Sequence, residues 1–402
     1  MSTTILTPSP AAPTVPLPQA RRALAGASLA HALHDGYTDL IYILLPVWQA
    51  EFALGYGALA ALRGLYAGTM AALQVPSGWL AGRVGARAVL IAGTLLAALG
   101  YALAGLSGGL LGLCTALILS GAGSSTQHPL ASAAVSRAYG AAARGPLGTY
   151  NFAGDLGKAA LPALTSLLLA FLPWRPALWL LSALGMLVAV AVRWLVPAFA
   201  RAASAPSRPA QGAARGGFAL LFAIGVLDSG VRMGFLTFLP FLLQAKGADL
   251  PLVGLALTLV FLGGAAGKFA CGWLGARFGL LATVLATEAG TAAAILAVLV
   301  LPLASALALL PLLGVMLNGT SSVLYGTVPE LAPPGRVEHA FALFYTGTIG
   351  SGALSPVLYG IIGDLTGPGW GTAAAAGAAL LTCPLALLLA PRLKSTHPSP
   401  AG

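Results

Sequence analysis

The sequence predicts an all-α membrane protein in which twelve transmembrane helices form two pseudo-symmetric six-helix bundles. Composition is the first observation behind this prediction: 58% of the 402 residues are hydrophobic and only 7% are charged, whereas a soluble domain has about 25% charged residues. The second is that the apolar runs continue for about 20 residues or more, which excludes the alternating strands of a membrane β-barrel. The third is a repeat that relates the two halves of the chain.

Hydropathy divides the chain into two sets of six spans, each long enough to cross a bilayer core of about 30 Å. The expected spans are 24–47, 54–80, 87–108, 110–135, 146–171 and 175–197, followed by 217–244, 252–274, 280–302, 304–329, 338–363 and 370–391. They predict bundles at 21–198 and 217–392, a cytoplasmic linker at 199–216, a disordered cytoplasmic tail at 1–20 and a second cytoplasmic tail at 393–402. Residues 1–20 contain no cation, so they do not read as a secretory signal.

The distribution of Lys and Arg predicts which side of the membrane each loop faces. The loops on the side away from the two termini hold only Arg175 and Lys246. The side that carries both termini holds fourteen cations: Arg21, Arg22, Arg83, Arg87, Arg137, Arg144, Arg193, Arg201, Arg208, Arg215, Arg277, Arg336, Arg392 and Lys394. This positive-inside bias predicts a multi-pass protein of the plasma membrane (a bacterial inner membrane) with both termini cytoplasmic. The net charge of +10 is then explained by the orientation of the chain in the membrane, and it indicates no nucleic-acid partner.

The two halves match without a gap at an offset of 194 residues. Gly78-Trp-Leu-Ala-Gly-Arg-Val-Gly85 corresponds to Gly272-Trp-Leu-Gly-Ala-Arg-Phe-Gly279, and Leu45-Pro46 corresponds to Leu239-Pro240. Internal duplication of this kind is typical of secondary transporters, in which two similar bundles move about a site near the bilayer midplane. A sensor or scaffold has no comparable need for it.

The Gly-x-x-x-x-Arg-x-Gly element of each half resembles the loop signature of the major facilitator superfamily. The resemblance covers nearly the whole chain and implies the major facilitator fold. It also implies a gating loop made of Gly78, Arg83, Gly85, Arg87, Gly272, Arg277 and Gly279. The family usually has an acidic residue before the Arg, where this chain has Gly82 and Ala276. Alternatively, Arg83 and Arg277 only anchor the headgroup layer.

Three segments resemble a narrower branch, the fosmidomycin-resistance-type efflux transporters. They are the run from His31 to Pro46 with Asp35 four residues after the His, the Gly- and Ser-rich run Gly121–Pro129, and Gly154-Asp-Leu-Gly157. That branch more often has a neutral residue where Asp155 stands. The resemblance implies a proton-coupled antiporter that exports small molecules, and it does not identify the substrate.

The first span carries four titratable residues, His31, His34, Asp35 and Asp39. A charged side chain at the bilayer centre costs at least about 2.5 kcal/mol, so each one calls for a reason. Asp35 lies about 16 Å along the helix from the start of the span, near the midplane. We therefore expect these four residues, with Asp228 at the matching depth of the second half, to be candidates for proton coupling. The alternative is that they are hydrogen-bonded polar residues that hold neighbouring helices together.

Further charges within the spans are candidates for substrate binding. Arg232 can pair with Asp228 four residues before it, or can meet an anionic substrate or Asp35 across a cavity. Arg63 is a second candidate cation, unless it extends towards the membrane surface. Asp155 and Lys158 can pair with each other, or Asp155 and His128 can form an inner proton or substrate station. Lys268 is expected to extend to the surface and Glu288 to have a structural partner, while four aromatic residues can line a cavity: Tyr37, Tyr150, Tyr325 and Tyr345.

Two transport hypotheses follow. The first is a proton-coupled secondary transporter that exports a small organic compound by alternating access. The second is an organic-anion symporter or exchanger that uses Arg63 and Arg232 as substrate cations. The sequence has no catalytic triad, phosphate loop or metal-ligand spacing in a suitable context, so neither an enzyme, a cofactor nor a metal is expected. Three dispersed cysteines indicate no disulfide, and the expected partners are a small-molecule substrate, protons and lipid, with the chain a monomer.

Overall fold

The computed structural model describes residues 14–198, 217–333 and 337–394, and nearly all of them are helical. The first half contains α1 (Leu17–Phe52), α2 (Tyr56–Val84), α3 (Ala86–Leu106), α4 (Leu110–Ser124), α5 (Gln127–Tyr139), a 3₁₀ turn (Gly140–Ala142), α6 (Arg144–Phe171) and α7 (Trp174–Leu195). The second half contains α8 (Gly217–Ala245), α9 (Leu250–Val300), α10 (Leu303–Leu331), α11 (Val337–Thr366) and α12 (Pro368–Lys394). The expected linker at 199–216 and the outer parts of both tails lie outside the described residues.

The fold class predicted from the sequence is confirmed, but the helix boundaries differ at the start of α1, within the fourth span and, as described below, at Gly279 of α9. α1 begins at Leu17, inside the expected N-terminal tail. The fourth span is divided into α4 and α5 at residues 125–126. There the hydroxyls of Ser125 and Thr126 donate to carbonyls of the preceding turn, and Pro129 has no N–H to continue the helix.

Two glycines turn the backbone at corresponding positions of the two halves. Gly85, with φ of 100°, separates α2 from α3. Gly279, with φ of 83°, bends α9 so that it comprises the eighth and ninth expected spans. A positive φ of this size favours glycine because it has no Cβ. The two positions are 194 residues apart, so the same backbone feature recurs at the offset of the sequence repeat.

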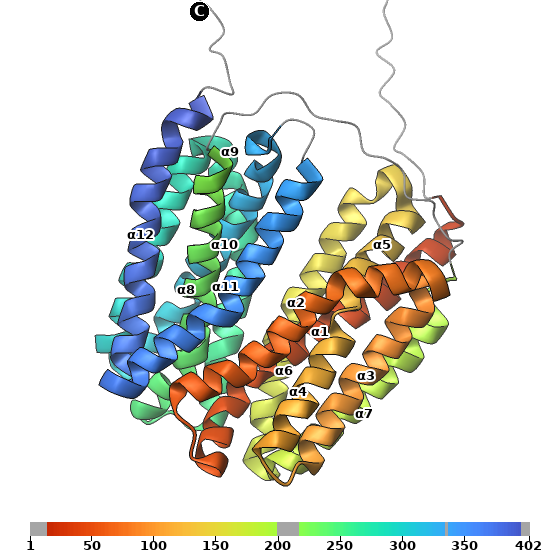
Figure 1. Ribbon diagram of the computed structural model, residues 1–402, viewed down its shortest axis with the longest axis horizontal. Helices are drawn as coiled ribbons and strands as arrows, with labels where there is room; N and C mark the ends of the chain where they lie inside the picture. Colours follow the sequence, from red (N-terminus) through yellow and green to blue (C-terminus); the bar gives the residue numbers. More distant parts are fainter. Residues whose placement is uncertain (1–13, 199–216, 334–336, 395–402) are drawn as a thin grey trace, which may run out of the picture.

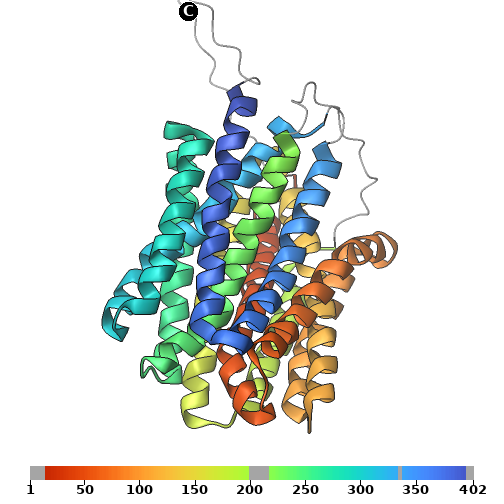
Figure 2. The ribbon, with the colours of Figure 1, turned by 60° about the vertical axis from the view of Figure 1, so that its left-hand side comes forward.

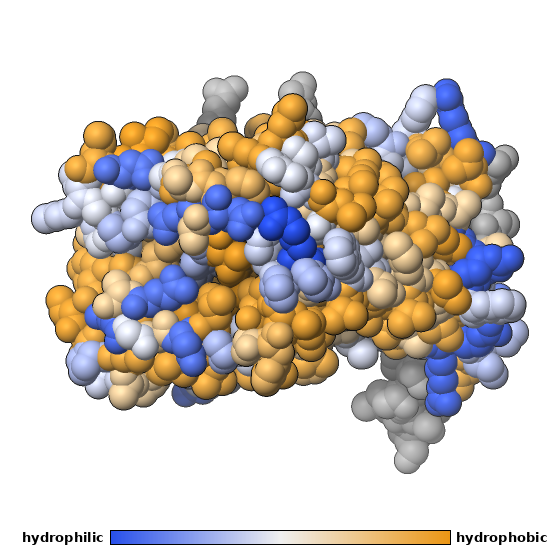
Figure 3. Space-filling model, turned by 90° about the horizontal axis from the view of Figure 1, so that it is seen from below, coloured by the Kyte–Doolittle hydropathy of each residue, from blue (hydrophilic) through white to orange (hydrophobic). Residues whose placement is uncertain are grey.

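By length and composition alone, six helices in the described part of the chain are able to cross a membrane: α3, α7, α8, α9, α10 and α12. α4 and α5 have 15 and 13 residues and span together rather than singly. Large exposed apolar side chains such as Leu111, Phe171 and Val300 also indicate a lipid-facing exterior. The end of the molecule seen from below has hydrophobic areas, with hydrophilic residues in a band across its middle and along one edge (Figure 3).

The two halves form separate bundles that meet at one end of the molecule and diverge at the other (Figures 1 and 2). We call the end at which α12 finishes the terminal end and the opposite end the far end. Near the far end, residues 39–46 of α1 and 234–243 of α8 are buried on every face. The halves are therefore closed against each other there.

Small residues and one carboxylate bring the halves together across the far end. α2 and α11 meet closely, since a Cβ on Gly360 would lie 2.6 Å from Gly57 Cα. The carboxylate of Asp364 on α11 accepts hydrogen bonds from the first N–H groups of α2, at 2.6 Å from Tyr56 N and 3.0 Å from Gly57 N. These groups have no partner within their own helix, so a carboxylate from the other half caps α2.

Candidate functional site

Asp35 of α1 lies at the centre of the most densely charged cluster in the first half. Its carboxylate is buried and meets three nitrogen groups from three helices. His31 Nε2 lies 3.2 Å from Oδ2, Lys158 Nζ of α6 lies 3.3 Å from the same oxygen, and His128 Nε2 of α5 lies 3.5 Å from Oδ1. The side chains of His128 and Lys158 are 41% and 32% exposed, so the cluster can be reached from outside the protein.

The hydrogen bonds of His31 define where its hydrogen lies. His31 Nδ1 is 2.9 Å from the backbone oxygen of Tyr150. A carbonyl oxygen only accepts, so Nδ1 carries a hydrogen. In the neutral ring Nε2 would then present a lone pair to the Asp35 carboxylate, which would repel it. The contact between His31 Nε2 and Asp35 Oδ2 therefore requires one further proton.

Glycines of α6 let this cluster form. A Cβ on Gly154 would lie 2.6 Å from His31 Nε2 and 2.9 Å from Asp35 Oδ2. A Cβ on Gly157, one turn later, would collide with the backbone carbonyl of Ala32. The Gly154-x-x-Gly157 pattern thus allows α6 to lie directly against α1 at the depth of Asp35.

The pairing expected between Asp155 and Lys158 is wrong. Lys158 binds Asp35, whereas both oxygens of Asp155 bind Lys268 Nζ of α9, at 2.6 and 2.7 Å. Lys268 therefore does not extend to the membrane surface. Residues three apart on a helix point in directions about 60° apart, and here each faces a different neighbouring helix. His128 contacts Asp35, and the expected station of His128 with Asp155 stays a prediction.

His34 has neutral polar neighbours. Its Nε2 lies 3.1 Å from the hydroxyl of Thr94, which itself donates to Leu90 O, and its Nδ1 lies 2.9 Å from Ser124 Oγ. Ser124 is hydrogen-bonded in turn to Tyr66 OH at 2.7 Å. Both ring nitrogens are satisfied by hydroxyls, so this arrangement joins α1 to α3 and α4.

Arg63 lies between the halves and does not extend to the surface. Its guanidinium donates to Gly352 O at 3.4 Å and to Met233 Sδ at 3.1 Å, and lies 4.7 Å from the centre of the Tyr42 ring. Its Nε has no hydrogen-bond partner in the part of the chain that the structure describes. Within the described residues no carboxylate forms an ion pair with this buried cation.

The local pair expected between Asp228 and Arg232 does not form. Arg232 donates to Ser321 Oγ at 3.2 Å and its Nε is unpartnered. Asp228 is instead hydrogen-bonded to Glu288 of α9, which also contacts the hydroxyls of Thr320 and Thr382. Two buried carboxyls can form a hydrogen bond only when one of them carries a proton. One proton shared between Asp228 and Glu288 would satisfy both carboxyls, a prediction that variants of Glu288 test below.

Asp39 lies one turn beyond Asp35, buried and near three cations. Lys158, Arg63 and Arg232 interact with it electrostatically. Its carboxylate has no direct hydrogen bond or ion pair among the residues that the structure describes. Asp39 and two arginines, from both halves, thus offer unfilled hydrogen-bonding capacity in one region.

The four candidate aromatic residues occupy different surroundings. Tyr37 does not line a cavity, because it is buried inside the first half and donates to Leu181 O at 2.6 Å. Tyr150 stacks on His31 with ring centroids 4.2 Å apart. Tyr325 contacts Tyr345 at 4.8 Å, and Tyr345 is half-exposed. Three of the four therefore remain candidates for contact with a substrate.

The loop arginines stack on aromatic rings. Arg83 lies 3.6 Å from the Trp79 ring, and Arg277 lies 5.6 Å from the Trp273 ring. Arg87 donates to the backbone oxygen of Arg193 on α7. Gly78 and Gly272 have open space beside them. The acid usual in this loop is replaced by Gly82 and Ala276, so no carboxylate of the loop faces these arginines.

A metal ion fits the cluster poorly. Ligand atoms of His31, Asp35 and His128 lie within 4.8 Å of one another. The Lys158 ammonium group, however, is already 3.3 Å from the same carboxylate and would repel a divalent cation.

Three residues have contacts that the sequence did not predict. Glu288 and Lys268 were assigned structural or surface positions, and Asp364 was not considered. The sequence does show that each of these three charged residues lies within or next to an apolar span. An unpaired charge is costly there, so a partner could have been expected. Their partners lie on helices far away in sequence, which hydropathy cannot identify.

Comparison with known proteins agrees with this architecture. A model of the Major Facilitator Superfamily matches residues 27–222 and 220–402. Two solved structures of a bacterial homologue of the human lysosomal transporter Spinster, both inward-facing, cover 96% of this chain and 100% of their own at 16% identity. Their TM-scores are 0.75 for the unoccupied form and 0.79 for the occupied form. No curated protein matches the chain by sequence.

The class of protein that these findings define is a multi-pass membrane transporter that works by alternating access. The chain belongs to the Major Facilitator Superfamily.

Proposed function

We propose that this protein is a proton-coupled exporter of a small organic compound. The observation that carries the proposal is the contact between His31 and Asp35, which requires a proton because His31 Nδ1 donates to Tyr150 O. An intramembrane carboxylate that shares a proton with an imidazole is suited to coupling proton movement to transport.

The same contact suggests how proton binding changes the site. With the proton present, Asp35 is bound by His31 as well as by Lys158 and His128. Without it, His31 Nε2 and the carboxylate repel each other. Asp35 then becomes available to a substrate donor or cation, so proton and substrate would occupy it in turn.

We further propose that the terminal end faces the cytoplasm of a cell bounded by its plasma membrane. The sequence predicts fourteen of the twenty Lys and Arg residues on the side of the two termini, which is the expected bias for cytoplasmic loops. The partly exposed His128, Lys158 and Lys268 and the closed far end would then correspond to an inward-facing state, like the solved relatives. Substrate would enter from the cytoplasm.

The test begins with a growth screen of cells that express or lack the protein against diverse toxic compounds. A compound to which expression gives resistance is then followed in proteoliposomes with an imposed pH gradient. We expect export driven by inward proton flow, abolished in Asp35→Asn. Asp249→Asn, which removes an acid at the start of α9 that caps its own helix, is the control and should transport normally. Transport that ignores the pH gradient, or that survives Asp35→Asn, would contradict the proposal.

A second candidate is an organic-anion symporter or exchanger. It is favoured by two arginines, Arg63 between the halves and Arg232 beside Ser321, which form no ion pair with a carboxylate among the described residues. An anionic substrate could bridge them by charge-assisted hydrogen bonds. In that case Arg63→Gln would abolish transport of an anion, whereas transport of a neutral or cationic compound would survive it. Substrates of opposite charge in the growth screen separate the two functions.

A further inference from the structure

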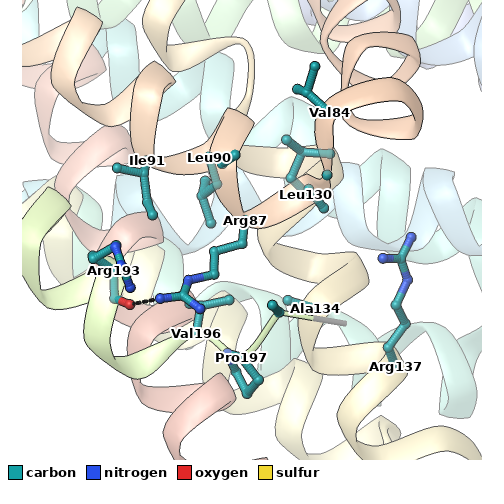
Figure 4. A pocket seen from close by; sticks show the side chains of 14 residues that line it. Val84, Arg87, Leu90, Ile91, Leu130, Ala134, Arg137, Arg193, Val196 and Pro197 are labelled. Carbon is teal, nitrogen blue, oxygen red and sulfur yellow. Dashed lines mark hydrogen bonds between the residues drawn. The ribbon is translucent and has the colours of Figure 1, made fainter. Parts of the chain in front are cut away.

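A cavity opens at the terminal end of the first half, well away from the Asp35 cluster. It has a volume of about 240 Å³ and lies between the α2–α3 loop, α5 and the end of α7. Figure 4 shows its side chains: Arg87 lies between Arg193 and Arg137, with Leu90, Ile91 and Leu130 along one side. Three cationic side chains and several apolar ones thus share one pocket.

The positive charge of this pocket has no counter-charge in its surroundings. None of the lining residues is acidic. The acids of the first half are Asp35, Asp39, Glu51 and Asp155, and none occurs between residues 52 and 154. Arg87 uses part of its guanidinium on the backbone oxygen of Arg193, while the Arg137 and Arg193 side chains are exposed. The pocket is therefore a place of unbalanced positive charge.

The backbone adds to this charge. α3 begins at Ala86, directly after Gly85, which provides no side-chain cap. Gly85, Ala86, Arg87 and Ala88 all line the pocket, so the unpaired N–H groups of the first turn of α3 lie at its edge. The positive end of the helix and the arginines favour the same kind of ligand, an anion with several acceptor oxygens.

The apolar lining indicates an amphiphile rather than a free anion. Val84, which is exposed, and the half-buried Ile91 are the accessible apolar part of the lining, and Leu90, Leu130 and Val196 are buried behind them. Trp194, next to Arg193, is exposed, as is usual for Trp at a membrane surface. A phosphate with acyl chains matches both parts of the pocket, whereas inorganic phosphate matches only the arginines.

We propose that this pocket binds the headgroup phosphate of an anionic phospholipid from the leaflet at the terminal end. Arg137 and Arg193 would bind the phosphate oxygens, the start of α3 would donate backbone hydrogen bonds, and the acyl chains would lie outside the pocket against Val84, Ile91 and Trp194. Basic pockets between transmembrane helices bind anionic headgroups in this way. The proposal does not depend on the transported substrate or on proton coupling.

The experiment measures lipid binding by the purified full-length protein with native mass spectrometry and in nanodiscs. The probe is phosphatidylglycerol, compared with phosphatidylcholine of the same chains. The test variant is Arg137→Gln/Arg193→Gln, which leaves Arg87 and its backbone contact in place. The control is Arg144→Gln, which removes an exposed arginine of the same half at the same end that does not line the pocket.

We expect the wild type and the control to prefer phosphatidylglycerol, and the double variant to bind it about fivefold more weakly for each arginine removed. Thermal unfolding of the double variant in detergent without added lipid should match that of the wild type, which excludes misfolding as the cause. Equal binding by the double variant and the control would overturn the proposal. Displacement of phosphatidylglycerol by millimolar inorganic phosphate would also overturn it, because the pocket would then be a site for a free anion.

Discussion

Glu288 is the residue whose surroundings most change the interpretation of the second half. It is buried within α9, hydrogen-bonded to Asp228, and bordered by Thr320 and Thr382. Thr320 donates to Thr287 at 2.7 Å and Thr382 donates to Ala379 O at 2.6 Å. A hydrogen bond between the two carboxyls needs a hydrogen on one of them, because a carboxylate oxygen only accepts. Cys383, Tyr325 and Arg232 are the other titratable groups that face the pair.

We predict that Glu288→Gln retains most of the stability of the wild type, because the amide N–H₂ can donate to Asp228 in place of the shared proton. Glu288→Leu should lower the free energy of unfolding by about 3 kcal/mol, since it leaves the Asp228 carboxylate buried without its partner. Thermal unfolding in detergent of both variants measures the difference. Equal unfolding temperatures for Gln and Leu would show that no proton is shared there.

The individual site residues were only partly predictable. Hydropathy and the cost of buried charge identified Asp35, His31, Arg63 and Asp228 as candidates, because a charge in an apolar span is visible in the sequence. Their partners were not visible. Asp155 and Lys158 are near neighbours in sequence, yet each pairs with a residue on another helix, so the local pairing rule gave the wrong answer.

At the scale of helices, α1 and α6 form the contact on which the Asp35 cluster depends. Gly157 meets the backbone carbonyl of Ala32, and Gly36 meets the side chain of Leu161. Backbone atoms cannot move aside as a flexible side chain can, so a methyl group at residue 157 would force the two helices apart.

We predict that Gly157→Ala destabilises the protein by about 1–3 kcal/mol and disrupts proton coupling, even though alanine is the better helix former. Gly145→Ala is the matched control, because it lies on the same helix with open space beside it. Its stability should be unchanged or slightly increased. A comparison of thermal unfolding and expression of the two variants tests this, and a stable Gly157→Ala would contradict the close contact.

The helix order followed from the sequence more reliably than the helix ends. Long apolar runs predicted all twelve spans, but the break between α4 and α5 depends on hydroxyl hydrogen bonds and on Pro129, which hydropathy does not measure. The continuity of α9 through Gly279 is likewise a matter of local geometry. Gly85 and Gly279 belong to the repeated motif of the sequence, and the structure shows that both have a positive φ, which favours glycine.

At the scale of the whole molecule, the closed far end depends on contacts between the halves. Asp364 of α11 caps α2 by two hydrogen bonds, Tyr56 contacts Phe238 and Phe241, and Tyr42 contacts Met233. Alternating access requires all of these contacts to break when the far end opens. Asp364 therefore helps to set the balance between the two states.

We predict that Asp364→Ala shifts this balance towards the far-end-open state by about 2 kcal/mol, or roughly thirtyfold, because a charged acceptor and its helix-end interaction are lost. A cysteine introduced at residue 241, with the three native cysteines replaced, should react faster with a water-soluble maleimide in this variant. Asp249→Ala, which removes a cap within one half, should leave the reaction rate unchanged. An unchanged rate in Asp364→Ala would mean that the cap does not hold the far end closed.

The internal repeat made the two-half architecture predictable, but no pattern in the sequence indicated which residues join the halves. Asp155–Lys268 and Asp364–α2 connect positions more than 100 residues apart. Such contacts exist only in one arrangement of the bundles, so they depend on the conformational state as well as on the sequence.

The central claim is that the contact between His31 and Asp35 holds a proton, and ¹⁵N NMR of histidine-labelled protein in nanodiscs tests it most directly. Five histidines are present, and His31→Gln assigns the relevant signals. In the wild type we predict hydrogens on both ring nitrogens of His31, because Asp35 also accepts from Lys158 and remains the acceptor. In Asp35→Asn the side-chain amide can donate to Nε2, so only Nδ1 should carry a hydrogen. A wild-type His31 with a bare Nδ1, or identical spectra for the wild type and Asp35→Asn, would contradict the account.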